Sequence, residues 1–230
     1  QKNAAWIKVP EYVDVKFLFI NYLTKISRAT INNAPILLLG FILEYEEVAL
    51  FAIAYKLSQL LSLFLVASNT ISAPAIAKYF EASEESELTR YVRGAATLSF
   101  VSSLPLFFLY ALFPEYLLAV FGKEYTGVSG VLIVLSIGFL INNFTGPSGY
   151  LLTMTGNELF QCINGIGHAI LLLLFFPTVT ANYGLLGASI VVSIVNISIN
   201  SVSTYVGYRK TRVLCLPWYR FNFDSFLNKK

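Results

Sequence analysis

The 230-residue sequence contains little of the chemistry that metal sites and redox sites use. It has 2 cysteines, 1 histidine and 1 methionine, and only 13% of its residues are charged. Cys162 and Cys215 are far apart in the sequence, in or beside apolar segments, so they indicate neither a disulfide framework nor a thiolate metal site. One histidine without a second ligand nearby in the sequence does not support a metal site or a proton relay. We therefore predict no metal site and no cofactor.

Motifs for nucleotide binding and for catalysis are also missing. The sequence has no glycine-rich loop followed by Lys-Ser or Lys-Thr, as nucleotide binding would require. The apolar segments contain no paired carboxylates and no Ser-His-Asp or Cys-His arrangement. The basic residues form no separate soluble domain, so a nucleic-acid partner has little support. We predict a protein that is not an enzyme, has no catalytic residues and binds no nucleic acid.

Apolar residues are abundant. They make up 56% of the sequence, and the mean hydropathy is +0.66, far above that of an average soluble domain. The stretch from Val128 to Leu152 has no acidic or basic residue, and about 20 helical residues are enough to cross a bilayer core. We predict an all-α, polytopic membrane helix bundle of about six transmembrane helices.

Hydropathy divides the chain into three parts. Residues 1–15 combine aromatic residues with scattered charges, as interfacial segments do. Residues 16–208 are predicted to form a six-helix transmembrane lobe, and residues 209–230 a cytoplasmic basic tail. The predicted spans are 16–43, 48–80, 91–113, 128–152, 159–177 and 185–208.

The basic residues predict the orientation of this lobe. Six spans place both ends on one side of the membrane, and that side receives 14 of the 16 lysines and arginines. Lys56 falls inside a span, and Lys123 falls on the opposite side. Because basic residues concentrate in cytoplasmic segments, we predict a multi-pass protein of the cytoplasmic membrane with both ends of this chain cytoplasmic.

Polar side chains recur at helical spacing within the spans, which places them on one face of each helix. These stripes are Asn21, Lys25, Arg28 and Asn32 in the first span, Gln161, Asn164 and His168 in the fifth, and Ser189, Ser193, Asn196, Asn200 and Ser203 in the sixth. Polar groups inside spans usually face a bundle interior or a water-filled path. The stripes therefore indicate either helix packing or a polar cavity.

We predict that many of these residues line a substrate cavity. Arginine offers a planar set of donors to phosphate oxygens, and lysine offers a compact positive charge. The candidate residues are Arg28, Lys56, Lys25, Asn32, Gln59, Asn142, Asn143, Asn164, Asn196 and Asn200. Each type of residue also has an alternative role. The lysines and Arg28 could extend along their aliphatic chains to place the charge at the membrane interface. The asparagines and serines could form hydrogen bonds between neighbouring helices, and His168 could be a packed histidine whose ring nitrogens are both hydrogen-bonded.

Four stretches carry a family resemblance: LLLGFIL, AIAYKLSQLLSLFLVASNTISAPAIAKYF, LFPEYLLAVFGKEY and, from 121 to 156, FGKEYTGVSGVLIVLSIGFLINNFTGPSGYLLTMTG. The amino-acid sequences of these stretches resemble those of the polysaccharide and O-antigen flippases of the multidrug/oligosaccharidyl-lipid/polysaccharide exporter superfamily. The resemblance implies the C-terminal lobe of a two-lobe transporter that moves a polyprenyl-diphosphate-linked oligosaccharide across the membrane by alternating access, for cell-surface polysaccharide biosynthesis. It implies four partners: the lipid-linked oligosaccharide, membrane lipid, a missing N-terminal lobe of the same chain and, as a further candidate, polysaccharide assembly proteins.

The sequence departs from the family pattern at Asn33-Ala34, where relatives often carry an acidic residue, so the resemblance does not extend an ion-coupling role to these two positions. Two alternatives stay open. A drug or cation antiporter of the same superfamily is expected to place carboxylates inside its cavity. A membrane-bound envelope-synthesis transferase is expected to show a catalytic histidine or aspartate pair at the edge of a span, and His168 alone does not meet that requirement.

Overall fold

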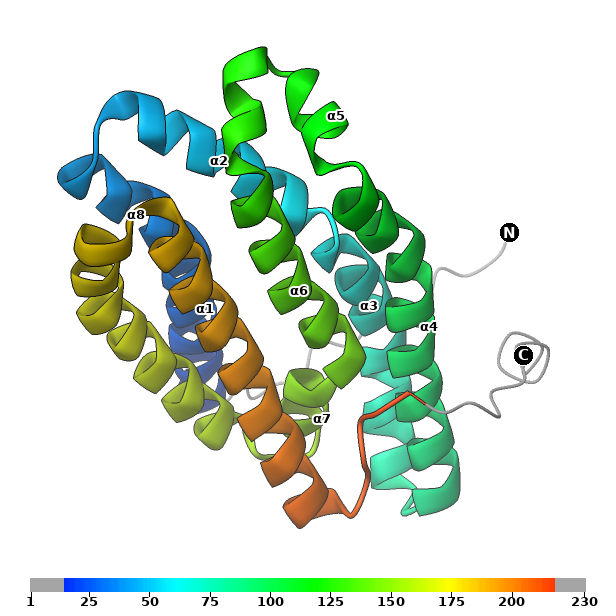
Figure 1. The fold of residues 1–230 in the computed structure, drawn as a ribbon. Coiled ribbons are helices and arrows are strands. Elements are labelled where there is room, and N and C mark those ends of the chain that lie inside the picture. Colours follow the sequence, from blue (N-terminus) through cyan, green and yellow to red (C-terminus); the bar gives the residue numbers. More distant parts are fainter. Residues whose placement is uncertain (1–14, 218–230) are drawn as a thin grey trace, which may run out of the picture.

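The computed structural model describes residues 15–217, which form a bundle of helices without a strand (Figure 1). The elements are α1 (Val15–Ile42), α2 (Tyr45–Gln59), α3 (Ser62–Glu81), α4 (Glu85–Leu112), α5 (Pro114–Ala119), the 3₁₀ helix η1 (Lys123–Val128), α6 (Ser129–Thr145), α7 (Ser148–Met154) and α8 (Glu158–Thr211). The predicted all-α bundle is confirmed for these residues. Except for Val15, the predicted lead-in lies outside them, as does the predicted tail beyond residue 217.

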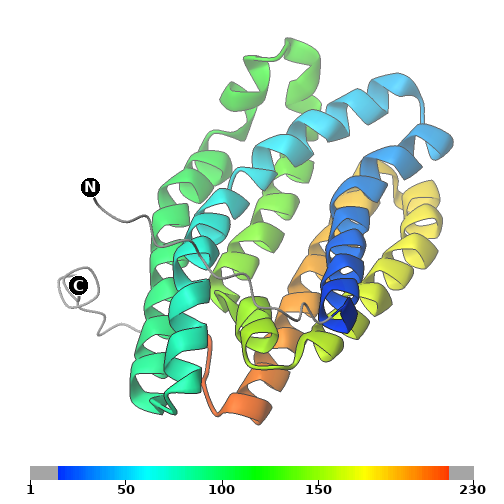
Figure 2. The ribbon, with the colours of Figure 1, turned by 180° about the vertical axis from the view of Figure 1, so that it is seen from behind.

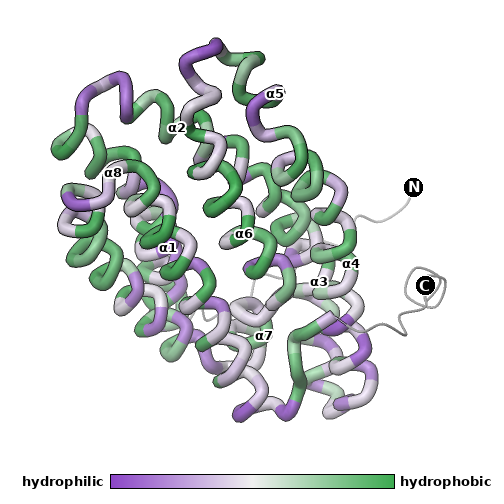
Figure 3. Tube along the Cα trace, in the orientation of Figure 1, coloured by the Kyte–Doolittle hydropathy of each residue, from purple (hydrophilic) through white to green (hydrophobic). Residues whose placement is uncertain are grey.

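The chain is a membrane protein. In the described residues, 4 helical stretches are long and apolar enough to cross a membrane: Tyr45–Glu81, Glu85–Leu112, Lys123–Thr145 and Glu158–Thr211. The helix α1 lies outside these stretches, since it carries three basic residues and three asparagines over its 28 residues. Large apolar side chains such as Ile71, Val101 and Leu174 are exposed, and hydrophilic residues concentrate toward the two ends of the bundle (Figure 3). This distribution is the one that a lipid environment favours.

The helix α8 is a hairpin of two arms, residues 158–183 and 185–211, which turn back at Gly184 (Figure 1). Gly184 has φ 59° and ψ −149°, a combination open to glycine and strained for other residues. The predicted loop after residue 177 is instead helical as far as Tyr183, because Pro177 does not end the helix and Asn182 donates a 2.7 Å hydrogen bond to the Thr178 carbonyl. The fifth predicted span therefore extends to the single-residue turn.

The second predicted span lies within the apolar stretch Tyr45–Glu81, which contains two helices, α2 and α3. Between α2 and α3 the chain tightens at Leu60 and Leu61, whose N–H groups bond carbonyls three residues earlier. The carbonyl of Leu57 also accepts a 2.9 Å hydrogen bond from Tyr110 Oη of α4. No proline or glycine marks this interruption, which is contacted instead by side chains of neighbouring helices.

The fourth predicted span is also divided. Gly146, with φ 59°, and Pro147 separate α6 from the short α7. Gly146 packs against Ala96 of α4 so closely that no side chain fits there. The Gly-Pro pair explains the division, since proline lacks the N–H that would continue the helix.

Residues 212–217, here called the strap, fasten the end of α8 to α3 and α4 (Figures 1 and 2). Val213 and Cys215 are fully buried against Ile76, Leu88 and Val92. Arg93 Nε donates a 3.3 Å hydrogen bond to the Leu214 carbonyl. The strap thus closes one end of the bundle between helices that are distant in the sequence.

Candidate functional site

A cavity of about 710 Å³ lies among α1, α2, α3, α6, α7 and the second arm of α8. Seven of the ten residues predicted to line a cavity are in its wall: Arg28, Asn32, Lys56, Gln59, Asn142, Asn196 and Asn200. They come from four different helices, so the fold brings together residues that are up to 172 positions apart in the sequence. Two members of the polar stripe of α1, Arg28 and Asn32, and two of the stripe in the second arm of α8, Asn196 and Asn200, line this space.

The wall is rich in amides and carries positive charge. Its carboxamides are Asn32, Asn33, Gln59, Asn69, Asn142, Asn196 and Asn200, and its ionised side chains are Arg28 and Lys56. No aspartate or glutamate is among the lining residues in the described part of the chain. The site therefore suits a ligand that is anionic at one point and rich in hydrogen-bonding groups elsewhere.

Arg28 stands at the wall where α1 approaches α7. Its Nη2 lies beside Gly149, whose missing side chain leaves room for the guanidinium. Among residues 15–217 no carboxylate is paired with Arg28. A permanent positive charge without an internal counterion, facing a polar cavity, is chemically suited to bind an anion.

Lys56 is exposed to the cavity from α2. Its Nζ donates a 3.3 Å hydrogen bond to Gln59 Oε1, one helical turn away. The Tyr55 hydroxyl donates to the Asn32 carbonyl at 3.1 Å and thereby ties this part of α2 to α1. The ammonium group is thus held by an amide and has no carboxylate among its described neighbours in the wall.

The amides offer acceptors to a ligand. Asn196 and Asn200 each use an Nδ2 hydrogen on a carbonyl four residues earlier in α8, at 3.0 and 2.8 Å. Asn69 and Asn142 have buried Oδ1 atoms without a hydrogen-bond partner. Buried polar atoms are normally satisfied by protein, water or ligand. Hydroxyl groups or ordered water in the cavity would meet that need.

The remaining three predicted residues are not among those that line this cavity. Lys25 is exposed elsewhere on α1. Asn143 points about 100° around the helix from Asn142 and donates a 2.8 Å hydrogen bond to the Leu61 carbonyl. Asn164 donates to the Ile199 carbonyl and to Ser203 Oγ, both at 3.0 Å. The contacts of these two asparagines are hydrogen bonds between helices, which is the alternative that the sequence analysis left open.

The structure confirms the interpretation of one polar residue, and it adds two residues to the cavity that the sequence analysis missed. His168 has both ring nitrogens partnered, by the Asn164 carbonyl at 2.8 Å and by Ser198 Oγ at 3.0 Å, which confirms the packed histidine. Asn33 and Asn69 line the cavity but were not candidates. A signal for Asn69 existed, since Ser62, Val66 and Asn69 recur on one face of α3.

Comparisons of the chain with protein-family models, with curated proteins and with solved structures found no match. The family resemblance therefore stays a prediction, and the chemistry of the cavity is the guide to function.

Proposed function

We propose that the protein moves a polyprenyl-diphosphate-linked oligosaccharide across the cytoplasmic membrane, for cell-surface polysaccharide biosynthesis. The observation that carries this proposal is a membrane-protein cavity with two cations, seven carboxamides and no carboxylate in its described wall. Arg28 and Lys56 would hold the diphosphate, because guanidinium and ammonium groups both bind phosphate oxygens. The asparagines would contact sugar hydroxyls directly or through water.

The size of the cavity agrees with a head group rather than a whole lipid. Its volume of about 710 Å³ falls within the roughly 300–1,000 Å³ of ordinary ligand pockets. A long isoprenoid tail would stay in the surrounding lipid, where the outer faces of the helices are apolar. The division of polar head in the cavity and apolar tail in the bilayer is what a lipid-linked glycan requires.

Transport of this kind needs no covalent chemistry from the protein. It needs two conformations, each open to one side, whose balance the substrate shifts by binding them differently. Two wall segments are interrupted helices, at Leu60–Leu61 and at Gly146–Pro147. Such interruptions in a membrane are tolerated beside a cavity or within protein, and they are natural places for the wall to bend.

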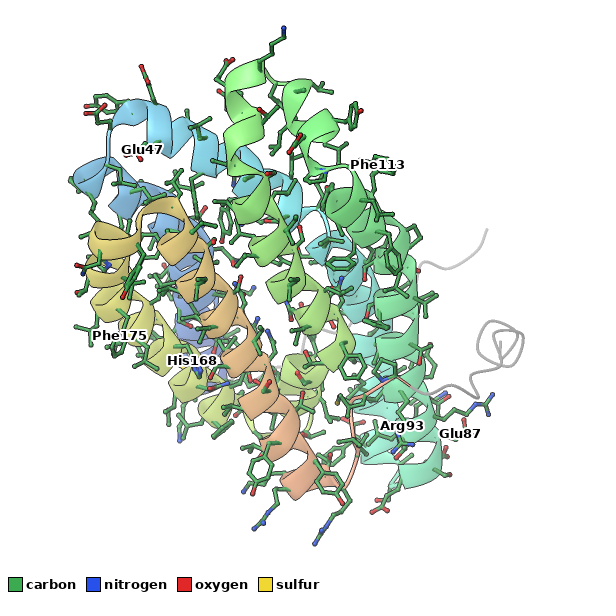
Figure 4. All side chains as sticks on the ribbon, in the orientation of Figure 1. Glu47, Glu87, Arg93, Phe113, His168 and Phe175 are labelled. Atoms are coloured by element: carbon green, nitrogen blue, oxygen red, sulfur yellow. The ribbon has the colours of Figure 1, made fainter. Side chains whose placement is uncertain are left out.

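The distribution of charge supports a cytoplasmic location for the end of the bundle that contains the α3–α4 turn. Figure 4 places Arg93 and Glu87 at that end and Glu47 at the opposite end. The basic residues around the α3–α4 turn and the end of α8 are Lys78, Arg90, Arg93, Arg209, Lys210 and Arg212. Basic residues mark cytoplasmic segments. An N-terminal lobe of the same chain and polysaccharide assembly proteins remain proposed partners.

The proposal is tested with Arg28→Gln and Lys56→Gln in the full-length protein, with Lys123→Gln as the control, since Lys123 is exposed and lies outside the cavity. We expect the two cavity variants to lose glycan export at normal membrane levels and the control to retain it. Normal export by both cavity variants would refute the proposal. A drug-efflux assay on the same strains tests the antiporter alternative, which the carboxylate-free wall does not favour.

A further inference from the structure

One side of the cavity is apolar, and it lies where α2 joins α3. Leu60, Leu63 and Val66, here called the apolar row, line the cavity and are 42%, 59% and 56% exposed. Lys56 lines the same space one helical turn earlier. Apolar surface that faces a polar space is unfavourable, and covering it with another apolar group is favoured. The wall therefore has a place for an apolar group beside a positive charge.

Helix geometry sets Lys56 and the apolar row in one line. The four residues follow one another at spacings of 4, 3 and 3, and residues three or four positions apart share a helix face. The N–H groups of Leu60, Leu61 and Leu63 bond carbonyls three residues earlier, each at 3.1 Å. This is the 3₁₀ pattern, in which side chains three residues apart are aligned. The interruption between α2 and α3 thus aligns the cation with the apolar side chains.

The facing walls of the cavity have a different chemistry. The helix α1 contributes Arg28 and Asn32, and the second arm of α8 contributes Asn196 and Asn200. A ligand that matches both kinds of wall is amphiphilic, with an anionic group near the cations and an apolar chain attached to it. A ligand that is polar throughout would leave the apolar row uncovered.

We infer that the apolar row binds the start of the isoprenoid chain, with Lys56 at the diphosphate and the apolar side chains along the carbons that follow. This inference rests on the proposed function, and it adds that the cavity recognises the carrier lipid as well as the head group. From Leu60 to Val66 the row rises over six residues, or about 9 Å at 1.5 Å per residue. It therefore covers only the first part of a long chain, and the remainder lies in the bilayer.

Two variants remove the apolar character of the row with little change in shape. Leu63→Asn and Val66→Thr exchange apolar atoms for polar atoms in side chains of similar size. Both residues are more than half exposed, so no packed group is lost and the unfolding temperature should stay near that of the wild type. The matched controls are Leu174→Asn and Val101→Thr, at residues that are 65% and 49% exposed and do not line the cavity.

The measurement is the preference of the purified full-length protein for geranyl diphosphate over dimethylallyl diphosphate, taken as the ratio of their dissociation constants in titration calorimetry. The two probes carry the same charge and differ in chain length, and detergent takes up each probe equally for every variant. One additional buried methylene strengthens binding about fourfold. The wild type and both controls should prefer geranyl diphosphate about tenfold or more, and Leu63→Asn and Val66→Thr should each reduce that preference about threefold or more.

The inference is overturned if the wild type binds neither probe or binds both equally. It is also overturned if Leu63→Asn and Val66→Thr keep the preference of the wild type, or if the two controls lose it to the same extent.

Arg28→Gln and Lys56→Gln separate this inference from the transport proposal, because they should weaken binding of both probes and leave the preference between them. Export that depends on Arg28 and Lys56, in a protein without a chain-length preference, would leave the function standing and remove the role of the apolar row. A preference that responds to Leu63→Asn and Val66→Thr, in a protein whose glycan export ignores Arg28→Gln and Lys56→Gln, would do the reverse.

Discussion

Asn143 of α6 reaches across the bundle and donates a 2.8 Å hydrogen bond from Nδ2 to the carbonyl of Leu61, in the interruption between α2 and α3. Its own carbonyl accepts a 3.0 Å hydrogen bond from Ser99 of α4. The preceding residue, Asn142, faces the cavity instead. Two adjacent asparagines thus have different environments. Asn142 lines the cavity, whereas Asn143 bonds the interruption between α2 and α3 from outside the cavity.

Asn143→Ala should destabilise the protein, while Asn142→Ala should leave its stability nearly unchanged. Removing the Asn143 amide leaves a buried carbonyl without that donor, which typically costs about 1–3 kcal/mol. The check is the free energy or midpoint of unfolding in detergent for both variants. Equal destabilisation by the two changes would contradict the separate roles, as would a stable Asn143→Ala protein.

Gly138→Ala should weaken the contact between α6 and α8. A methyl group on Gly138 would stand 2.9 Å from the Cα of Ser193, which is backbone and has little room to move. Ser193 also donates a 3.0 Å hydrogen bond to the Val134 carbonyl, so both helices are already at close approach. Overpacking of this kind costs about 1–3 kcal/mol.

The control for that change is Gly130→Ala on the same helix, whose methyl group would meet its nearest neighbour, Leu186, at an ordinary 3.5 Å. Alanine is favoured over glycine by up to about 1 kcal/mol in a helix interior. Unfolding midpoints should therefore fall for Gly138→Ala and hold or rise for Gly130→Ala. The reverse order would refute the close contact.

Tyr110→Phe should loosen the interruption between α2 and α3. The Tyr110 hydroxyl donates to the Leu57 carbonyl at 2.9 Å, and its loss should cost about 0.5–1.5 kcal/mol. Hydrogen exchange of residues 57–63 should become faster, with no such change in Tyr183→Phe, where the tyrosine is exposed at the α8 turn. Unchanged exchange in Tyr110→Phe would show that the interruption does not depend on this bond.

The thiol of Cys215 should make attachment of the strap depend on pH. Burial raises the pKa of Cys215 to about 12, although nearby Arg93 acts in the opposite direction. An unfolded cysteine ionises near about 8.5, so the released strap binds fewer protons than the attached strap at higher pH. The stability that this thiol contributes is complete below that value and is lost as the pH rises toward 12.

Maleimide labelling of Cys215 in a Cys162→Ala background checks this expectation. Labelling of the folded protein should be slow at neutral pH and should keep accelerating between about pH 9 and 11, where an exposed thiol has already levelled off. A rate that levels off near pH 9 would contradict a strap held by a protonated, buried thiol.

Helical spacing was sufficient to predict that part of two polar stripes shares a face. Arg28 and Asn32 in α1, and Asn196 and Asn200 in α8, repeat at intervals that place them on one side of their helices, and both pairs line the cavity. Periodicity identifies a face but not what the face meets. For this reason Asn164 carried the same signal, yet it bonds the opposite α8 arm.

Tertiary contacts decided what the sequence did not predict. The interruption at Leu60–Leu61 contains no proline or glycine, and it is contacted by Tyr110 and Asn143, which are remote in the sequence. The close approach of Arg28 and Gln161 to Gly149 is likewise a tertiary contact, and no local pattern distinguishes that glycine from Gly167, which faces open space. By contrast, Gly146-Pro147 is a visible helix breaker, although the predicted span ran through it.

A flipping assay decides whether the cavity carries a lipid-linked glycan. The full-length protein is reconstituted in vesicles that hold a fluorescent polyprenyl-diphosphate oligosaccharide in one leaflet, and its appearance in the other leaflet is followed for the wild type, Arg28→Gln, Lys56→Gln and Lys123→Gln. The account predicts transfer by the wild type and Lys123→Gln and little transfer by the two cavity variants. Transfer at the same rate by all four proteins, or by none, would contradict it.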